Sequence, residues 1–303
     1  MARPCSRAQR APSRPPGAPI LATAASPIRA AWRGTLSLFV VAAALAGAAG
    51  CASQAPISRA GHVPELRPGV LAGYLQADQR PDSLRLVPPP PASGSEAFAA
   101  DEEAARANLA RAGSPRWQVA VEDANLKFPQ AAETFSCALG VPINERDTPQ
   151  LYMLLRRSLV DAGLSTYRAK DHYRRQRPFL VNHLPTCTPD EAARLSRDGS
   201  YPSGHNAAGW AWALILTEVD PERADAILAR GLAYGQSRLA CNVHWQSDAN
   251  QGRVMGAATV ARLHADPTFR ADLAAARTEV AAARAKGLKP ARDCAAERAA
   301  LGQ

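Results

Sequence analysis

Apolar residues recur every three to four positions along most of the chain after residue 95, the spacing of an amphipathic helix. The pattern predicts helices over residues 96–112, 130–139, 148–162, 205–219, 221–239, 244–264 and 267–285. No long stretch alternates apolar and polar residues, and no fixed-period repeat occurs. We therefore expect an all-α protein, a single-domain helical bundle of roughly 200 residues, which is an ordinary domain size.

Three positions have sequence signals for helix starts. Residues 188–191 (TPDE) have the spacing of a capping box with proline at the first helical position. Asp220-Pro221 and Asp266-Pro267 open two further helices in the same way.

The first 92 residues have a different pattern. Fourteen of the 25 prolines lie at or before Pro91, no acidic residue precedes Glu65, and six arginines lie in the first 50 positions. After these arginines, the apolar run 36–45 is followed by small residues, an order typical of a secretory signal and too short for a membrane span. We expect a leader over 1–50, a proline-rich arm over 51–92, a helical domain over 93–290 and a tail over 291–303.

The end of the leader has two interpretations. Ala48-Ala49-Gly50-Cys51 resembles a bacterial lipoprotein processing site, where Cys51 would carry lipid and become the mature N-terminus. Ala48 is smaller than the aliphatic residue usual at that position, so ordinary cleavage nearby is the alternative.

Composition and charge narrow the function classes. Hydrophobic residues make up 47% and charged residues 21%, so the chain should fold rather than remain disordered. The net charge of +9 suggests a polyanionic partner, but removing the six leader arginines from 36 basic against 27 acidic residues leaves +3. Since no basic stripe alternates with aromatic residues, we expect no nucleic-acid binding.

Cysteine usage agrees with export. Of six cysteines, Cys5 lies in the leader and Cys51 is the candidate for lipidation. The other four are Cys137, Cys187, Cys241 and Cys294. In an oxidising compartment four cysteines permit two disulfides with three connectivities, and buried free thiols are the alternative. No CxxC pair suggests a zinc or redox site.

Basic residues are concentrated in residues 170–178 (KDHYRRQRP). Lys170 and Arg177 are seven apart, two helical turns, so we expect them on one helix face that ends at Pro178. Two cations on one face need an anionic partner. Taken alone, the run fits a solvated basic surface better.

Residues 199–205 (GSYPSGH) directly precede the apolar run that begins at Ala207. Glycines beside a serine at a helix start leave N–H groups free and let an anion approach closely, where the helix dipole favours it. The segment therefore fits a phosphate cradle, and an ordinary turn and cap equally well.

A third segment contains Arg238, His244 and Asp248. His244 and Asp248 are four apart on a predicted helix, so the carboxylate can accept from one ring nitrogen and leave the other bare. A histidine held in this way can be a nucleophile or base. A surface pair and a metal half-site are the alternatives, although no convincing further ligands accompany them, and we expect no metal.

Together the segments read K-x6-R-P, P-S-G-H and S-R-x5-H-x3-D, in that order. This order resembles the signature of the phosphatidic acid phosphatase type 2 superfamily, which includes acid phosphatases, lipid phosphatases and vanadium haloperoxidases. The fuller sequences GSYPSGH and HWQSD, with LVPPPP at 86–91, are similar to the class A nonspecific acid phosphatases of the bacterial periplasm. The resemblance covers roughly residues 70–287. Asn206 stands where the class usually has Thr.

The resemblance implies a helical fold of the acid phosphatase/vanadium haloperoxidase type and a periplasmic, metal-independent enzyme that hydrolyses phosphomonoesters. It makes His244 the nucleophile, Asp248 its partner and His205 the acid and base. The residues that it implies for phosphate binding are Lys170, Arg177, Arg238, Ser203 and Gly204.

It also implies pairing of Cys187 with Cys241, which leaves Cys137 with Cys294. We expect no cofactor, and contact with a membrane only through a lipid on Cys51. The apolar helices leave room for a homo-oligomer.

Two alternatives remain, and a third is discounted. A vanadium haloperoxidase can share the same oxyanion ligands, and a phosphate-binding lipoprotein would bind without turnover. A membrane lipid phosphatase would need several apolar spans near the motifs, and the catalytic region has none of the required length.

Overall fold

The computed structural model describes residues 57–59 and 61–302. The predicted leader, its apolar run, Cys5 and Cys51 lie outside the described residues.

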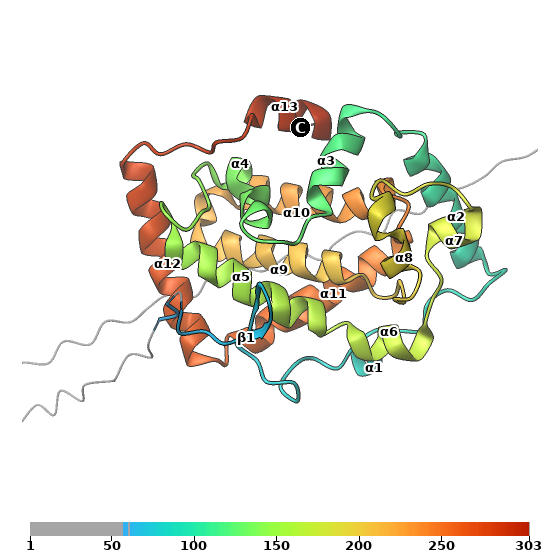
Figure 1. The fold of residues 1–303 in the computed structure, drawn as a ribbon, viewed down its shortest axis with the longest axis horizontal. Coiled ribbons are helices and arrows are strands. Elements are labelled where there is room, and N and C mark those ends of the chain that lie inside the picture. The colour runs from blue at the N-terminus through green and yellow to red at the C-terminus, as the bar shows by residue number, and fades with distance from the viewer. Residues whose placement is uncertain (1–56, 60, 303) are drawn as a thin grey trace, which may run out of the picture. The chain divides into compact units, whose positions relative to one another are not determined.

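Helices dominate the described part of the chain, which confirms the all-α prediction (Figure 1). The α-helices are α1 (Ser83–Leu86), α2 (Glu96–Leu109), α3 (Pro115–Asp123), α4 (Ser136–Leu139), α5 (Pro149–Leu164), α6 (Tyr167–Tyr173), α7 (Pro178–Asn182), α8 (Ala192–Leu195), α9 (Gly204–Val219), α10 (Ala224–Ala240), α11 (Gln246–Leu263), α12 (Pro267–Ala285) and α13 (Cys294–Leu301). Short 3-10 helices span Gln130–Phe135, Pro189–Glu191 and Pro221–Arg223, and β1 (Glu65–Arg67) pairs antiparallel with β2 (Val70–Leu71).

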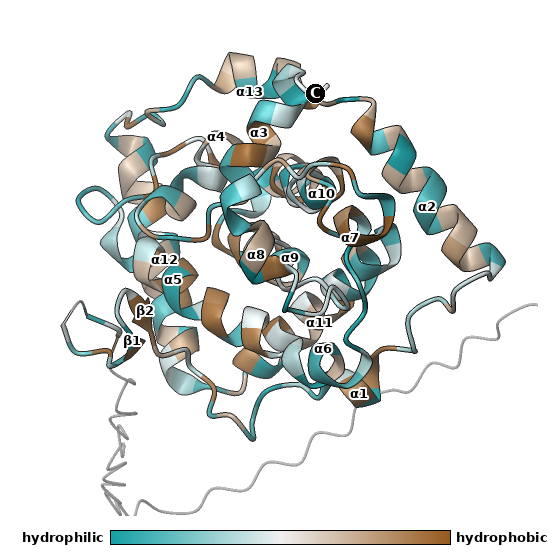
Figure 2. Ribbon diagram, turned by 45° about the vertical axis from the view of Figure 1, so that its right-hand side comes forward, coloured by the Kyte–Doolittle hydropathy of each residue, from teal (hydrophilic) through white to brown (hydrophobic). Residues whose placement is uncertain are grey.

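Helix α9 is the centre of the bundle and packs against α5, α10 and α11 (Figure 1). Its residues are apolar almost all round, as expected for a helix buried on every side. Glycines allow two of these close approaches. A Cβ on Gly209 would lie 2.1 Å from the Tyr234 ring, and one on Gly256 would lie 2.5 Å from the carbonyl oxygen of Ala207. The outer helix α2, in contrast, carries many hydrophilic residues (Figure 2).

Most predicted helices form close to their expected bounds, with several differences. At Asp220-Pro221 a 3-10 helix precedes α10, and the Asp220 side chain makes no capping hydrogen bond. Helix α13 lies in the segment expected as a tail. Residues 130–139 form a 3-10 helix followed by the single turn α4 instead of one helix. The predicted capping box at 188–191 is wrong, because Thr188 makes no capping hydrogen bond, and a 3-10 turn and the single turn of α8 follow it. Helix α3 was not predicted, although Ser114 caps it and Pro115 occupies its first turn.

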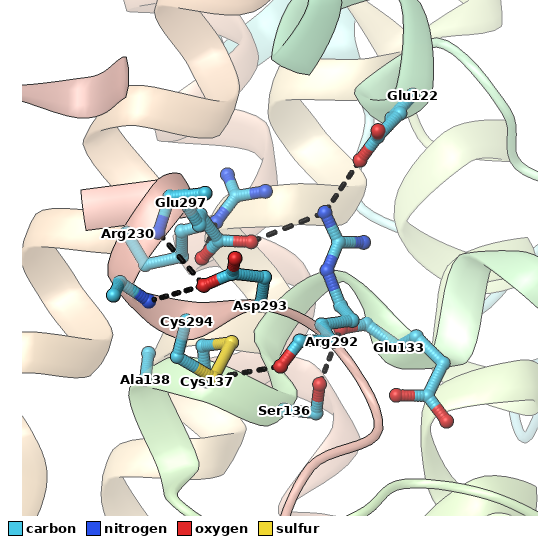
Figure 3. The surroundings of a disulfide bond; sticks show 12 residues. Glu122, Glu133, Ser136, Cys137, Ala138, Arg230, Arg292, Asp293, Cys294 and Glu297 are labelled. Atoms are coloured by element: carbon cyan, nitrogen blue, oxygen red, sulfur yellow. Dashed lines mark hydrogen bonds and ion pairs between the residues drawn. A yellow bond between two sulfur atoms is a disulfide. The ribbon is translucent and has the colours of Figure 1, made fainter. Parts of the chain in front are cut away.

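The structure forms both disulfides with the pairing that the family resemblance implied, Cys137–Cys294 and Cys187–Cys241. The first joins α4 to α13, in the segment expected as a tail (Figure 3). Glu297 of α13 also accepts from the buried Arg230 of α10 across 3.2 Å. The C-terminal segment is therefore docked on the bundle by covalent and ionic contacts.

Among residues 57–59 and 61–302, no helix combines the length and apolar character needed to cross a bilayer.

Candidate active site

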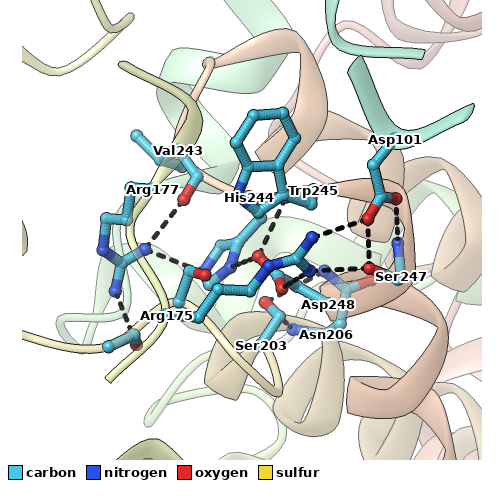
Figure 4. Close-up of polar contacts among 12 residues, drawn as sticks. Asp101, Arg175, Arg177, Ser203, Asn206, Val243, His244, Trp245, Ser247 and Asp248 are labelled. Atoms are coloured by element: carbon cyan, nitrogen blue, oxygen red, sulfur yellow. Dashed lines mark hydrogen bonds and ion pairs between the residues drawn. The ribbon is translucent and has the colours of Figure 1, made fainter. Parts of the chain in front are cut away.

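The nucleophile candidate and its carboxylate partner meet at the start of α11 (Figure 4). His244 precedes the helix and is not part of it, so the prediction that His244 and Asp248 share a helix face is wrong. Asp248 is instead the third helical residue, and its Oδ2 accepts from the Trp245 N–H across 2.9 Å, as in a capping box. The same oxygen lies 3.2 Å from Nδ1 of His244.

These contacts fix the tautomer of His244. An ionised carboxylate only accepts, so Nδ1 of His244 carries the proton that Asp248 holds. Nη1 of Arg177 lies 3.1 Å from Nε2, and a guanidinium only donates. Nε2 of His244 is therefore the unprotonated ring nitrogen, and its electron pair accepts from Arg177.

Lys170 and Arg177 do not share a helix face, contrary to the prediction. Helix α6 ends at Tyr173, Arg174 takes the left-handed conformation (φ 44°), and Arg177 lies in extended backbone before α7. Pro178 thus begins a helix instead of ending one, which suits proline at a first helical position.

The two cations meet nevertheless. Nη2 of Arg177 donates to Oδ2 of Asp198 across 3.0 Å, and Nζ of Lys170 lies 3.6 Å from the same oxygen. Lys170 also donates to the carbonyl oxygen of Gly199. A cavity of about 510 Å³ is lined by both cations together with Asp198 and Gly199.

Arg238, on the last turn of α10, is fully buried. None of its three guanidinium nitrogens has a hydrogen-bond partner among the described residues. Three unsatisfied buried donors of fixed charge are costly to a fold. An oxyanion with several acceptor oxygens would satisfy them, which makes this guanidinium the strongest local indication of an anion site.

Ser203 and the start of α9 form the predicted cradle. Ser203 is the N-cap, and the N–H groups of Gly204 and His205 donate to no group of the described chain. The Ser203 Oγ accepts from the backbone N–H of Asn206 across 3.3 Å and from the Nδ2 of Asn206 across 3.1 Å. Since Ser203 Oγ accepts two hydrogen bonds, its own proton is free to be donated to an anion.

His205 is held by a residue that sequence reasoning missed. Its Nε2 lies 3.0 Å from the carbonyl oxygen of Ala124, which follows α3. A carbonyl only accepts, so Nε2 carries a proton and Nδ1 is left to exchange a proton with another group. Helix α3 thereby orients the second histidine of the site.

Burial and clustered positive charge shift the ionisation of the whole group. Burial lowers the pKa of Lys170 to about 8 and that of Arg238 to about 10. Burial, followed by Arg177 and Lys170, places the pKa of His244 well below its usual range. Burial and Arg238 do the same to the pKa of His205. Both histidines are thus biased toward the neutral form.

The carboxylate of the site has opposing influences. Burial raises the pKa of Asp248, whereas the guanidinium of Arg175 lowers it. Nη1 of Arg175 donates to Oδ1 of Asp248 across 2.7 Å. Arg175 and Asp198 were not singled out from the sequence, although both lie within or beside the basic and glycine-rich segments.

The charges of Arg177, Lys170 and Arg238 all act on His244, and those of Arg238 and His244 act on His205. The structure thus groups a buried, unprotonated histidine nitrogen with three cations and a second histidine, although the cavity is lined by Lys170 and Arg177 and not by His244. Residues 150–271 match the PAP2 superfamily.

Relatives with known names cover most of the chain. A nonspecific acid phosphatase of Providencia stuartii is 44% identical over 209 residues, which are 69% of this chain and 84% of that protein. The nonspecific acid phosphatase of Salmonella typhimurium is 43% identical over 208 residues, 68% of this chain and 83% of that protein. An acid phosphatase of Zymomonas mobilis is 38% identical over 209 residues, 69% of this chain and 79% of that protein. The chain belongs to the class A bacterial acid phosphatases of the PAP2 superfamily.

Proposed function

We propose that this acid phosphatase hydrolyses phosphomonoesters of broad range through a phosphohistidine at His244, without a metal ion. The observation that carries the proposal is the arrangement around His244. Its Nδ1 proton is held by Asp248, and its unprotonated Nε2 accepts a hydrogen bond from Arg177, which also contacts Asp198 in the cavity. A histidine with this tautomer is prepared for nucleophilic attack at phosphorus.

In the first step, Nε2 of His244 forms a bond to phosphorus while the bond from phosphorus to the leaving oxygen breaks. His205 gives a proton to that oxygen, and the substrate leaves as an alcohol. The positive charge that develops on the ring of His244 is balanced by the carboxylate of Asp248. In the second step, His205 takes a proton from water, the water oxygen bonds to phosphorus, and the P–N bond breaks to release phosphate.

Fixed cations perform the charge neutralisation that magnesium supplies in many phosphoryl-transfer enzymes. Lys170, Arg177 and Arg238 are all at least 97% buried, as their exposed fractions are 3%, 1% and 0%. The unpartnered nitrogens of Arg238 support this role most directly. The Ser203 hydroxyl and the N–H groups at the start of α9 add neutral donors.

An acidic pH optimum follows from these roles. His205 must be protonated to act as an acid, and its pKa lies well below the usual range, so its acid form accumulates only as the pH falls. Asp248 must stay ionised, and burial raises its pKa, so activity is lost again at lower pH. A bell-shaped profile of kcat is the expected result.

The test is an assay with p-nitrophenyl phosphate in excess EDTA, with and without vanadate. We expect activity that survives EDTA and is blocked by vanadate, and its loss in His244→Ala. A normal rate in that variant would exclude His244 as the nucleophile. Bromide oxidation by peroxide after vanadate loading would instead indicate a haloperoxidase.

The enzyme is further proposed to act in the periplasm. The basic residues, apolar run and small residues that end at Gly50 support export, and two disulfides fit an oxidising compartment. Mass spectrometry of the mature N-terminus tests this and also decides between a lipid on Cys51 and ordinary cleavage.

A further inference from the structure

Arg175 is a buried cation that the proposed mechanism does not use, and it contacts the carboxylate of that mechanism (Figure 4). Its Nη1 donates to Oδ1 of Asp248 and its Nη2 to Oδ2 of Asp101, both across 2.7 Å. The side chain of Arg175 is 8% exposed, and those of Asp101 and Asp248 are 4% and 0% exposed. Charges so deeply buried are stable only when they are paired.

The two oxygens of Asp248 have different partners. Oδ2 accepts from Nδ1 of His244 and the N–H of Trp245, while Oδ1 accepts from Arg175. Because His244 and Trp245 hold Oδ2 and Arg175 holds Oδ1, the plane of the carboxylate is fixed and Oδ2 stays directed at the imidazole. Without Arg175, Oδ1 would lose its charged partner in a buried environment, which favours rotation or protonation of the carboxyl group.

Asp101 holds Arg175 from the other side and joins it to α11. Oδ1 of Asp101 accepts from the N–H of Ser247 across 2.8 Å, at the start of α11, where a negative charge is favourable. The hydroxyl of Ser247 accepts from Arg175 across 2.7 Å. Phe98, one turn before Asp101 on α2, packs on Trp245 with ring centroids 5.3 Å apart.

We propose that Arg175 and Asp101 are positioning residues for phosphohistidine formation, in which Arg175 keeps Asp248 ionised and directed at His244 while Asp101 fixes Arg175. This inference rests on the proposed function. Arg175 also lines the cavity that Lys170 and Arg177 border, but both of its Nη atoms donate to groups of the protein, namely Ser247, Asp248 and Asp101. Arg175 and Asp101 act by stabilising the carboxylate that balances the positive charge of the reacting imidazole.

The charged and titratable groups that influence Asp248 come from several segments: Arg175, Lys170, Arg177, Tyr201 and His244. Of the cations, Arg175 makes the hydrogen bond to the carboxylate, and it counteracts the rise in the pKa of Asp248 that burial causes. Removing it therefore moves the acid limb of kcat to higher pH.

The first variants are Arg175→Met and Arg175→Lys. In Arg175→Met we expect kcat to fall roughly tenfold to a hundredfold, a typical effect of losing a group that orients a site residue. We expect KM to stay within about twofold and the acid limb to rise by about 1 to 3 pH units. Arg175→Lys keeps the charge, so it should restore most of the acid limb. Arg106→Met, an exposed arginine on the same helix as Asp101, is the control.

Asp101→Asn tests the direction in which the acid limb of kcat shifts. Without the Asp101 charge, the positive charge of Arg175 is neutralised by Asp248 alone, so the pKa of Asp248 should fall. The acid limb of kcat should then move to lower pH, while kcat itself falls because Arg175 is less firmly held. Loosening of the structure alone would move both variants in the same direction. An upward shift in Asp101→Asn, or an unmoved acid limb with kcat within twofold in Arg175→Met, would overturn the proposal. If Arg175→Met does not fold, Arg175→Lys and Asp101→Asn still decide it by the directions of their shifts.

Trapping separates this inference from the function on which it rests. Rapid alkaline quenching after mixing with a 32P-labelled phosphomonoester should capture phosphohistidine in the wild type and none in His244→Ala. We expect slower capture in Arg175→Met. No label on the wild type would overturn the proposed mechanism together with the positioning role. Equal capture rates in the wild type and Arg175→Met would overturn the positioning role alone.

Discussion

Nη1 of Arg177 donates to Nε2 of His244 across 3.1 Å, so a single guanidinium contacts the proposed nucleophilic nitrogen and is also one of the residues proposed to bind phosphate. The contact holds His244 in its neutral form, because protonation of Nε2 would set two donors against each other. The pKa of His244 therefore depends on the same cation that is proposed to bind the phosphoryl group of the substrate.

The first prediction concerns the ionisation of His244. Arg177→Gln removes the cation that, after burial, lowers the pKa of His244 most, so this pKa should rise toward the ordinary value of about 6.5. Nitrogen-15 NMR should show His244 of the wild type neutral, with the proton on Nδ1, at a pH where part of the variant is protonated.

Lys170→Gln is the matched comparison, because Lys170 also lowers the pKa of His244 and is not among the hydrogen-bond partners of its Nε2. We expect a smaller rise there. A His244 titration that does not move in Arg177→Gln would contradict the assignment.

The second prediction separates function from stability at Arg238. Arg238→Met removes a buried charge without partners and should raise the free energy of unfolding by about 1–4 kcal/mol while abolishing activity. Inorganic phosphate at a hundred times its Kd should stabilise the wild type by about 2.7 kcal/mol and leave the variant unchanged. Thermal unfolding with and without phosphate measures both effects.

Arg230 provides the control for Arg238, since it is equally buried but bonded to Asp123 and Glu297. Arg230→Met leaves those carboxylates without their partner and should cost about 3–5 kcal/mol of stability. If both arginine variants lost stability alike, Arg238 would have an internal partner and would not be reserved for an anion.

The third prediction concerns Asn206, where the family usually has Thr. Nδ2 of Asn206 donates to Ser203 Oγ and, across 3.4 Å, to the carbonyl oxygen of Gly235, which fixes the amide orientation. Asn206→Asp would make the Ser203 hydroxyl donate to the new carboxylate and would place a like charge beside the substrate anion. We expect kcat/KM to fall by at least about a hundredfold, or about 2.7 kcal/mol of transition-state stabilisation.

Asn206→Thr is the informative comparison, because a hydroxyl at this position can still donate to Ser203. We expect kcat/KM to change by less than about tenfold, equivalent to one neutral hydrogen bond. Steady-state kinetics of the two variants with one substrate are sufficient. Equal losses in both would show that the volume at residue 206 matters more than its donor.

The fourth prediction compares the two disulfides. Replacing Cys137 and Cys294 by alanine should reduce stability by about 2–5 kcal/mol and leave kcat unchanged, because this bond joins α4 to α13 and neither helix carries a candidate site residue. Replacing Cys187 and Cys241 should also lower kcat, since Cys241 lies three residues before His244 and its carbonyl oxygen accepts from the Cys187 N–H. Unfolding in urea and an activity assay distinguish the pairs. Equal kcat losses would contradict the separation of roles.

The helices were predictable from the sequence because apolar periodicity and N-terminal caps are local. The Asp266-Pro267 start is correct, and Asp266 caps α12 across 2.8 Å. At residues 188–191 the same kind of signal failed. The 3-10 turn there is followed by α8, which is a single turn long. A helix this short gains little stability from a capped N-terminus.

The sequence motifs supplied the candidate site residues, but their geometry was not predictable from spacing. Spacing suggested helix faces for Lys170 with Arg177 and for His244 with Asp248, whereas loops and a helix start bring these pairs together. Asp101 and Ala124 lie far outside the motifs, and only tertiary folding places them at the site. The burial and pKa of the site residues depend on such distant neighbours, so they could not be predicted from local sequence.

The contact between Asp101 and Ser247 joins residues 146 positions apart, and the one between Ala124 and His205 spans 81. Contacts of such long range form late or slowly in folding, because the intervening chain must first be ordered. The site is thus assembled from segments far apart in the chain, and a chain that has formed only its local helices has no complete active site. The rate at which activity returns during refolding would accordingly report the rate at which α2 packs on α11. An enzyme assay would then measure completion of the tertiary fold.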